Sequence, residues 1–490
     1  MHHHSVSRRN VLRGLGGLGA TLAATSSPLR AADPSSPANP EDRKLLFVLC
    51  ATGGASIVDS FLPVELGEVP NSASPQTLNA YPGELLVQPE GSTIRCVRPL
   101  PDTDFLTAEY SIEAFLRDHY QELTVVCHEV TSVNHTVAQK RALTGAGINR
   151  GRTLAEAAAE RHGMGLPLAN CNMAVGGYVE PGDDRSLMPH AKGEIIASPL
   201  TYAVSTHGSR GITSSLAPAQ VDRARRIREQ LEVASSFGTT YRDARGRLEY
   251  LRMRSEVSSQ LEEMDAITKL MLLDPSGVAE LGLSRSPLQQ DLYKVFPGVL
   301  HDQWQQQGAL AFMLAYYGLS CANTMSLNFN PAFDGDALVG APLAFDFSHN
   351  FHRGAQNVMW GRVLRVADGL INLLKRFDYL GDPALGKMWD RSLIYVATDF
   401  GRDKTRPPDE SYFGTGHHLN NGSVLLSPLL QGNRVFGGVD PSTLLTHGFN
   451  LRTGESDPGA VLREPEVYSL VAQALDIDFP GRRDLSAVLA

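Results

Sequence analysis

The chain has 490 residues, of which 42% are hydrophobic and 20% are charged, and its formal net charge is −9. This length and apolar content allow a large buried core, either in several domains or in one α/β domain with insertions. The acidic balance, with no basic block, argues against nucleic acid as a partner. Beyond the N-terminal segment, no run reaches the roughly eighteen apolar residues of a membrane helix, so an integral membrane protein is not expected.

The N-terminal segment has the layout of a bacterial export signal. Ser7–Arg13 (SRRNVLR) is basic with paired arginines, Gly14–Ala24 is short, weakly apolar and glycine-rich, and Ser26–Ala32 ends in small residues suited to a signal peptidase. The pattern predicts a twin-arginine signal peptide over residues 1–32. The chain would then use the Tat translocase and work in the periplasm or as a secreted protein. The alternative is a buried helix after a disordered start.

Residues 33–43 are rich in Pro, Ser and Ala and are expected to form a linker. Residues 44–490 are expected to form the folded part. Five cysteines are present, at positions 50, 96, 127, 171 and 321, and none forms a C-x-x-C pair, so a zinc–thiolate site is not expected. Cys50 and Cys127 lie in apolar runs and are predicted to be core residues. The count allows one disulfide after export but not an extensive framework.

Short apolar runs predict buried strands at Leu45–Cys50, Leu123–Cys127, Leu393–Ala397 and Ser423–Ser427. Near-continuous apolar strands are typical of a parallel sheet covered on both faces. Helices are predicted at Ala138–Leu143, Thr153–Arg161 and Val358–Phe377. The expected fold class is therefore α/β, with a large, mostly parallel central sheet flanked by helices.

One segment differs in kind from the rest of the chain. Ala217–Leu273 is charged and mostly free of Gly and Pro, with a break at Phe237-Gly238. The pattern predicts a pair of helices inserted in the domain or packed on the edge of the sheet. Its charges are interpreted as a solvated face.

A polar turn follows the second predicted strand. Thr131–Thr136 (TSVNHT) leads directly into the predicted helix. A hydroxyl at such a turn lies where backbone N–H groups converge, which can hold a phosphate or sulfate and stabilise an alkoxide. The simpler interpretation is an N-cap, in which Thr131 or Ser132 satisfies free N–H groups.

This turn also carries a resemblance to a known family. Thr131, Asn134 and His135, with Thr144-Gly145 further along, resemble the nucleophile motif of the nucleotide pyrophosphatase/phosphodiesterase branch of the alkaline phosphatase superfamily. The resemblance implies that Thr131 is the nucleophile. It implies that Asn134 contacts a phosphoryl oxygen.

Three further motifs extend the resemblance. G-G-x-S-x-x-D-x-F begins at Gly53, D-F-G-R begins at Asp399, and G-x-x-H begins at Gly414 ahead of S-V-L-L. This combination is similar to a bacterial exported family catalogued as domain of unknown function 1501, which is placed with the alkaline phosphatase-like folds. The similarity runs from about Lys44 to Gly438 and is weakest in the helical insertion, 217–273. It implies an alkaline phosphatase-like fold and an exported, metal-dependent hydrolase acting on anionic phosphate or sulfate esters.

Potential metal ligands gather in two short segments and at one strand end. The candidates for binding a divalent metal (zinc, manganese or calcium) are Asp346, His349, His352, Asp399 and His417, with His418 beside them. Carboxylates and neutral imidazoles are suitable ligands, and a pair of cations could activate a hydroxyl and neutralise a leaving oxygen.

Two ligand positions of the superfamily are not filled in this chain. The first strand is followed by Ala51–Gly54 instead of an aspartate, and Asp59 lies further along; Phe400 stands where a histidine is usual. A full two-metal site is therefore not expected, and a single cation or none fits the sequence. Arg141 and Arg402 could hold an anionic group, although surface salt bridges are the simpler use.

These departures motivate an alternative to the hydrolase, a non-catalytic binding or envelope protein that retains the fold and an anion pocket. A separate alternative is a structural envelope partner that acts through the helical insertion.

Overall fold

The computed structural model describes residues 39–100, 110–205, 217–252, 260–261, 264–273, 285–327, 344–408, 410 and 412–490. The expected twin-arginine signal, 1–32, and most of the expected linker, 33–43, lie outside these residues. Within them, no helix combines the length and the apolar character that crossing a bilayer requires.

A central sheet of eight strands organises the chain, in the order β12-β4-β11-β8-β1-β7-β5-β6. Every neighbouring pair is parallel except those that include β11, which runs antiparallel to β4 and β8. The strands are β1 Leu45–Ala51, β4 Leu123–Glu129, β5 Asn170–Asn172, β6 Gly193–Ile195, β7 Ala322–Leu327, β8 Ser392–Thr398, β11 Asn420–Leu426 and β12 Arg434–Phe436. The predicted mostly parallel sheet is confirmed.

The four predicted strands correspond to β1, β4, β8 and β11. Every residue of β1, β8 and β11 is buried. Burial on both sides explains the near-continuous apolar runs, because neither face of these strands meets water. The strands β5, β6, β7 and β12 were not predicted. Three residues, as in β5, β6 and β12, give too little periodicity to recognise, and the polar residues of β7 (Asn323, Thr324 and Ser326) interrupt its apolar run.

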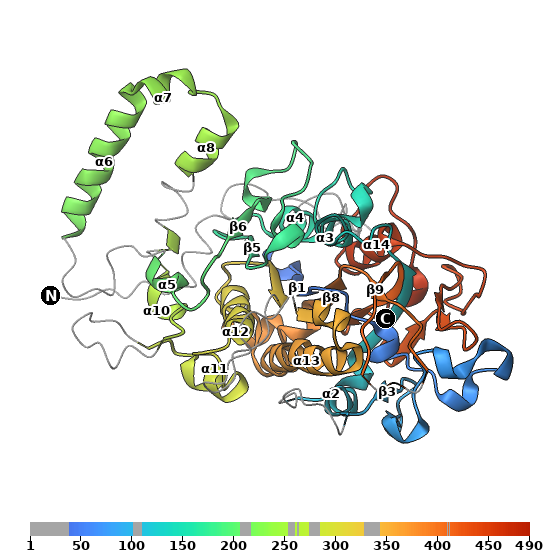
Figure 1. The fold of residues 1–490 in the computed structure, drawn as a ribbon. Helices are drawn as coiled ribbons and strands as arrows, with labels where there is room; N and C mark the ends of the chain where they lie inside the picture. Colours follow the sequence, from blue (N-terminus) through green and yellow to red (C-terminus); the bar gives the residue numbers. More distant parts are fainter. Residues whose placement is uncertain are drawn as a thin grey trace, which may run out of the picture.

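Helices cover both faces of the sheet (Figure 1). On one face lie α2 (Ile112–His119), α12 (Gln303–Tyr316) and α13 (His352–Arg376). On the other lie α3 (His135–Thr144), α4 (Leu154–His162) and α14 (Glu464–Ala474). Alternate residues of β1 pack into the two hydrophobic cores: Phe47 belongs to the core under α13 and Val48 to the core under α14.

The predicted helices are present, with shifted ends. Thr153 is the N-cap of α4, and its side chain forms a capping box with Glu156. The predicted Ala138–Leu143 helix starts earlier, at His135, because Asn134 is the N-cap and accepts a hydrogen bond from Val137 N.

The predicted insertion is largely helical in its described residues. It contains α6 (Pro218–Ala234), α7 (Ser236–Thr240), α8 (Arg245–Arg252) and the short α10 (Ala266–Lys269). Helix α6 ends at Ala234, so the break lies at Ser235, and the predicted break at Phe237-Gly238 falls inside α7. Helices α6, α7 and α8 form an arm that stands away from the sheet and its covering helices (Figure 1).

All five cysteines lie in the described residues, and each is buried with a free thiol. Burial raises the pKa of Cys50 well above its ordinary value, and Asp399 adds to the effect. The core role predicted for Cys50 and Cys127 is confirmed.

Candidate metal centre

Three parallel strands deliver polar residues to one edge of the sheet. Strand β8 ends at Thr398 and is followed by Asp399; β1 ends at Ala51 and is followed by the turn Thr52–Gly54; β4 ends at Glu129 and leads to helix α3. Ligand sites in α/β sheets form at the carboxyl ends of such strands. The site described below occupies this edge.

A compact turn after β1 brings the backbone against neighbouring side chains. Gly54 has a φ of +87°, and a Cβ there would lie 2.8 Å from the Phe400 ring and 2.9 Å from Arg402 Nε. Glycine is required by both the dihedral angle and the space. The G-G pair of the sequence therefore allows Phe400 and Arg402 to approach β1 closely.

Asp399 is completely buried, and each of its carboxylate oxygens accepts two hydrogen bonds. Oδ1 accepts from Gly53 N at 3.0 Å and from Tyr178 Oη at 2.9 Å. Oδ2 accepts from His135 Nδ1 at 2.7 Å and from Gln139 Nε2 at 3.0 Å. Since all four bonds use its lone pairs, Asp399 is placed to orient His135 and not to bind a metal directly.

Helix α3 supplies two of these donors from one face. His135 and Gln139 are four residues apart, so their side chains lie one turn above the other. Gln139 Oε1 also accepts from Gly177 N at 2.7 Å, which fixes the amide. The Nδ1 proton of His135 is thus committed to Asp399, and its Nε2 faces away from the helix.

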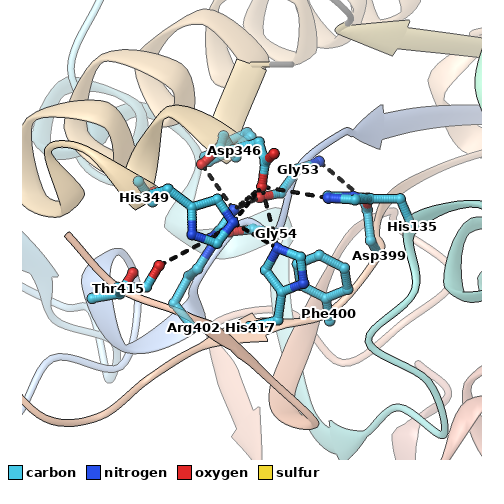
Figure 2. A network of polar contacts seen from close by, with 12 residues as sticks. Gly53, Gly54, His135, Asp346, His349, Asp399, Phe400, Arg402, Thr415 and His417 are labelled. Carbon is cyan, nitrogen blue, oxygen red and sulfur yellow. Dashed lines mark hydrogen bonds and ion pairs between the residues drawn. The ribbon is translucent and has the colours of Figure 1, made fainter. Parts of the chain in front are cut away.

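Asp346 is the meeting point of three imidazoles (Figure 2). Its Oδ1 lies 3.4 Å from His135 Nε2, 3.2 Å from His349 Nε2 and 3.3 Å from His417 Nε2. In a tetrahedral site with bonds of about 2.0–2.1 Å, neighbouring ligand atoms lie roughly 3.3 Å apart. The spacing around Asp346 therefore matches that of ligands that share one ion.

The tautomers of two of these imidazoles are set from outside the cluster. His417 Nδ1 lies 3.0 Å from Val133 O and donates to this carbonyl, as His135 Nδ1 donates to Asp399. With a metal ion bound, both rings would be neutral, and each would direct its Nε2 lone pair at the ion beside the Asp346 oxygen. Lone pairs that converge on a carboxylate oxygen repel one another unless a proton or a metal ion lies between them.

The charges of the cluster shift the pKa values of its members. Burial lowers the pKa of His135, but hydrogen bonds with Asp346 and Asp399 outweigh it and raise this pKa to about 9. Burial raises the pKa of Asp346, but His135 and Arg402 hold it well below its ordinary range. Burial and the Arg402 charge lower the pKa of His417.

Within the described residues, His135, Asp346 and His417 form a group that could hold a metal ion. Their side chains are about one-quarter exposed or less, so the group is open to solvent on one side. His349 lies beside this group, with its Nε2 2.8 Å from His417 Nε2, and its side chain is 42% exposed. Phe400 stacks on the His417 ring at a centroid distance of 4.0 Å.

Arg402 is fully buried against the other side of Asp346. Its Nη2 donates to Asp346 Oδ1 at 2.8 Å, to Phe345 O at 3.2 Å and to Gly53 O, and its Nε donates to Gly54 O. Arg402 was predicted as an anion-holding residue or a surface salt bridge. In the structure it is a buried cation paired with Asp346.

The structure brings together only part of the predicted ligand set. Asp346, His349 and His417 meet, and Asp399 lies behind His135. His352 belongs to a separate buried pair: its Nε2 is 3.0 Å from Asp59 Oδ2, and its Nδ1 is 3.0 Å from Thr415 Oγ1.

Asp59 also accepts hydrogen bonds from Asn79 at 2.7 Å and from Tyr81 at 2.5 Å. Burial raises its pKa, but the charge of His352 and these hydrogen bonds hold the pKa well below its ordinary range. Asp59 therefore faces His352 and not the Asp346 cluster.

Sequence reasoning missed His135 as a candidate ligand. His135 stands in the same motif as Thr131 and Asn134, at the first position of a helix that follows a sheet strand. A residue at that position lies near the carboxyl ends of the parallel strands, where ligand sites of α/β sheets form. Its pairing with Asp399 could not be foreseen without the turn of η9 (Gly176–Val179) that completes the donors.

The predicted catalytic residues have other partners in the structure. Thr131 Oγ1 donates to Glu464 Oε1 at 2.8 Å and accepts from Arg141 Nη1 at 2.9 Å. Asn134 Oδ1 accepts from Val137 N at 3.3 Å, so Asn134 and not Thr131 is the N-cap of α3. Ser132 Oγ in turn accepts from Asn134 N at 3.1 Å.

Neither a scan of protein-family models nor a search of curated proteins finds a match to this chain.

Proposed function

We propose that this chain is a hydrolase of phosphate or sulfate esters that works with one divalent cation held by His135, Asp346 and His417. One observation carries the proposal: two imidazoles whose Nδ1 protons are committed elsewhere converge on a single carboxylate oxygen. Catalytic metal sites keep three protein ligands and an open position, whereas structural sites are closed by four. A three-residue set open to solvent on one side supports the catalytic class.

The donor set favours zinc or manganese over calcium. Two imidazole nitrogens and one carboxylate oxygen suit these ions, whereas calcium prefers an all-oxygen shell of six to eight ligands. A bound cation of this kind would polarise an ester oxygen and lower the pKa of a bound water. His135 would hold the cation through Nε2 while Asp399 fixes its ring.

Arg402 supports a single cation in place of a pair. Its guanidinium already lies 2.8 Å from Asp346 Oδ1 and is held by backbone carbonyls. A second divalent cation that shared Asp346 would meet this fixed positive charge. In this proposal Arg402 neutralises part of the Asp346 charge and keeps the carboxylate turned toward the imidazoles.

Thr131 remains the proposed nucleophile. Its hydroxyl proton is directed at the Glu464 carboxylate, which is placed to accept it, and its oxygen receives an N–H from Arg141. A hydroxyl activated by an adjacent base is the usual form of a nucleophile in covalent catalysis. His349, the most exposed of the three imidazoles, is proposed to donate a proton to the leaving oxygen.

The contacts of Thr131 also support a second candidate function, a non-catalytic binding protein that retains the metal site. Thr131 Oγ1 is engaged by the side chains of Glu464 and Arg141, and within the described residues no hydrogen bond links it to the Asp346 cluster. An anion could then be bound beside a cation without being cleaved. The two functions differ in turnover and not in metal content.

We also propose export through the twin-arginine route and an alkaline phosphatase-like topology for the sheet. The paired arginines at positions 8 and 9 and the motif order support these proposals. Replacing both arginines with lysine should retain the full chain in the cytoplasm. Normal export of that variant would remove the twin-arginine route.

Turnover is tested on aryl phosphate monoesters, aryl phosphate diesters and aryl sulfates, with zinc or manganese added. Thr131→Ala should abolish turnover while the metal content and the fold are kept, and Thr131→Ser should retain part of it. Equal turnover by wild type and Thr131→Ala would remove Thr131 from the mechanism. A metal-loaded wild type that cleaves none of the esters would favour the binding protein.

A further inference from the structure

The arm formed by α6, α7 and α8 exposes a concentration of large apolar side chains. Of the nineteen exposed large hydrophobic residues among the described residues, seven lie on the arm: Ile227, Leu231, Val233, Phe237, Tyr241, Leu248 and Tyr250. None of the described side chains of α6 is buried. Concentrations of exposed apolar residues of this kind mark interaction surfaces.

Helix α6 is long for an element with no buried face. It has 17 residues, which corresponds to about 25 Å. Most helices in proteins owe their stability to packing of an apolar face and not to intrinsic helix propensity. A partner that covers α6 would supply the missing packing.

Four apolar residues of α6 form one narrow stripe, whereas Val233 lies on the opposite side of the helix. Ala224, Ile227, Leu231 and Ala234 follow one another at steps of three, four and three residues. This is the spacing of the a and d positions of a coiled coil, which is narrower than the apolar face of a core helix. Leu231 is 67% exposed and Ile227 is 46% exposed, so the stripe is uncovered.

Positive charges border the stripe on both sides. Arg223 and Arg228 occupy the flanking positions of this heptad pattern, and within the described chain no hydrogen bond or ion pair engages either guanidinium. Glu229 lies on the opposite side of the helix. Flanking charges select the partner of a helix, because opposite charges attract across the seam and like charges repel.

This charge pattern discriminates between occupants. In a parallel pair of α6 helices, Arg223 of one copy would face Arg228 of the other, which disfavours a second copy of this chain. A lipid surface requires a broad apolar face, whereas this stripe is narrow and α6 also carries Asp222 and Glu229. A helix with an apolar seam and acidic flanks fits both features.

We propose that α6 is the docking site for an acidic amphipathic helix of a partner protein. The partner's apolar seam would pack on Ile227 and Leu231, and its carboxylates would pair with Arg223 and Arg228. The arm stands away from helix α3 and strand β8, which lead into the site (Figure 1), so this inference stands independently of the metal-dependent reaction.

The probe is a fluorescent helical peptide of about 21 residues with leucine at a and d and glutamate at e and g. Its matched control carries lysine at e and g. The intact chain should bind the glutamate peptide at least about tenfold more tightly than the lysine peptide. Leu231→Asp should remove this binding, whereas Glu229→Gln, on the opposite side of α6, should leave it unchanged.

A double variant, Arg223→Glu with Arg228→Glu, provides the charge-exchange test. It should lose preference for the glutamate peptide and gain preference for the lysine peptide, with the unfolding midpoint of the chain unchanged. Equal binding of both peptides, or no binding, would overturn the proposal. The proposal would also be overturned if the chain did not bind the peptide but formed a dimer, or bound anionic lipid vesicles, in a way that depends on Leu231.

Discussion

His135 Nδ1 lies 2.7 Å from Asp399 Oδ2, and this contact turns the other nitrogen of the ring toward Asp346. The aspartate follows strand β8, and the histidine opens helix α3. The contact therefore joins two segments that are 264 residues apart. A buried carboxylate that orients a histidine in this way both fixes the tautomer and increases the basicity of the nitrogen that faces the ion.

Asp399→Asn tests this orienting role. An amide at this position can accept from only one oxygen and directs an NH2 group at two of the existing donors. Metal affinity should fall by about 10–100-fold, because His135 loses its fixed tautomer. The measurement is competitive titration of zinc against a chromophoric chelator.

Tyr178→Phe is the matched control, because it removes one Asp399 hydrogen bond without touching His135. It should leave zinc affinity nearly unchanged. Similar losses of affinity in both variants would mean that Asp399 acts through general stability and not through His135.

His349→Gln separates metal binding from proton transfer. His349 lies outside the group formed by His135, Asp346 and His417, so its replacement should keep the metal content. The value of kcat should fall by about 10²–10⁴-fold if His349 protonates the leaving group. Esters with good leaving groups should be much less affected, since they need less protonation. Loss of metal in His349→Gln would instead make His349 a ligand.

His162 predicts how stability depends on pH. Burial lowers the pKa of His162 to about 4, although a hydrogen bond to Leu475 O opposes this shift. Its ordinary value is about 6.5, so between these values the unfolded chain binds a proton that the folded chain does not. Stability should therefore fall as pH is lowered from about 6.5 to about 4. The loss from this residue at pH 5 is about 2 kcal/mol.

The measurement is the free energy of unfolding in urea at pH 7 and pH 5, for wild type and His162→Gln. Glutamine can keep the hydrogen bond to Leu475 but does not titrate. The variant should show the smaller pH dependence by about 2 kcal/mol. An identical pH dependence in both proteins would mean that His162 is protonated in the folded chain.

Two long central strands could be predicted from the sequence because burial on both faces leaves an uninterrupted apolar run, whereas β7, which is equally buried but contains Asn323, Thr324 and Ser326, was missed. Leu45–Ala51 and Ser392–Thr398 are such runs, and both lie at the centre of the sheet. The order of the strands could not be predicted. Pairing of β1 with β7 and β8 depends on contacts across 276 and 347 residues, which local patterns do not encode.

The candidate site was predictable in part for a related reason. Residue type and clustering in short segments identified Asp346 and His417, and the position at a strand end identified Asp399. Their division into ligand and orienting residue depends on the four donors around Asp399, which come from distant turns. The pairing of His352 with Asp59 could not be predicted either. Spacing alone does not distinguish a metal-binding histidine from a histidine in a buried ion pair.

The most direct test of the central claim is the metal content of the intact chain, expressed through its own export route and purified without chelators. We predict about one equivalent of zinc or manganese in the wild type. His135→Ala and His417→Ala should each lose it, whereas His352→Ala, which lies in the separate buried pair, should retain it if it folds. A chain that binds no divalent cation on purification or titration would contradict the account, and so would metal that persists in both His135→Ala and His417→Ala.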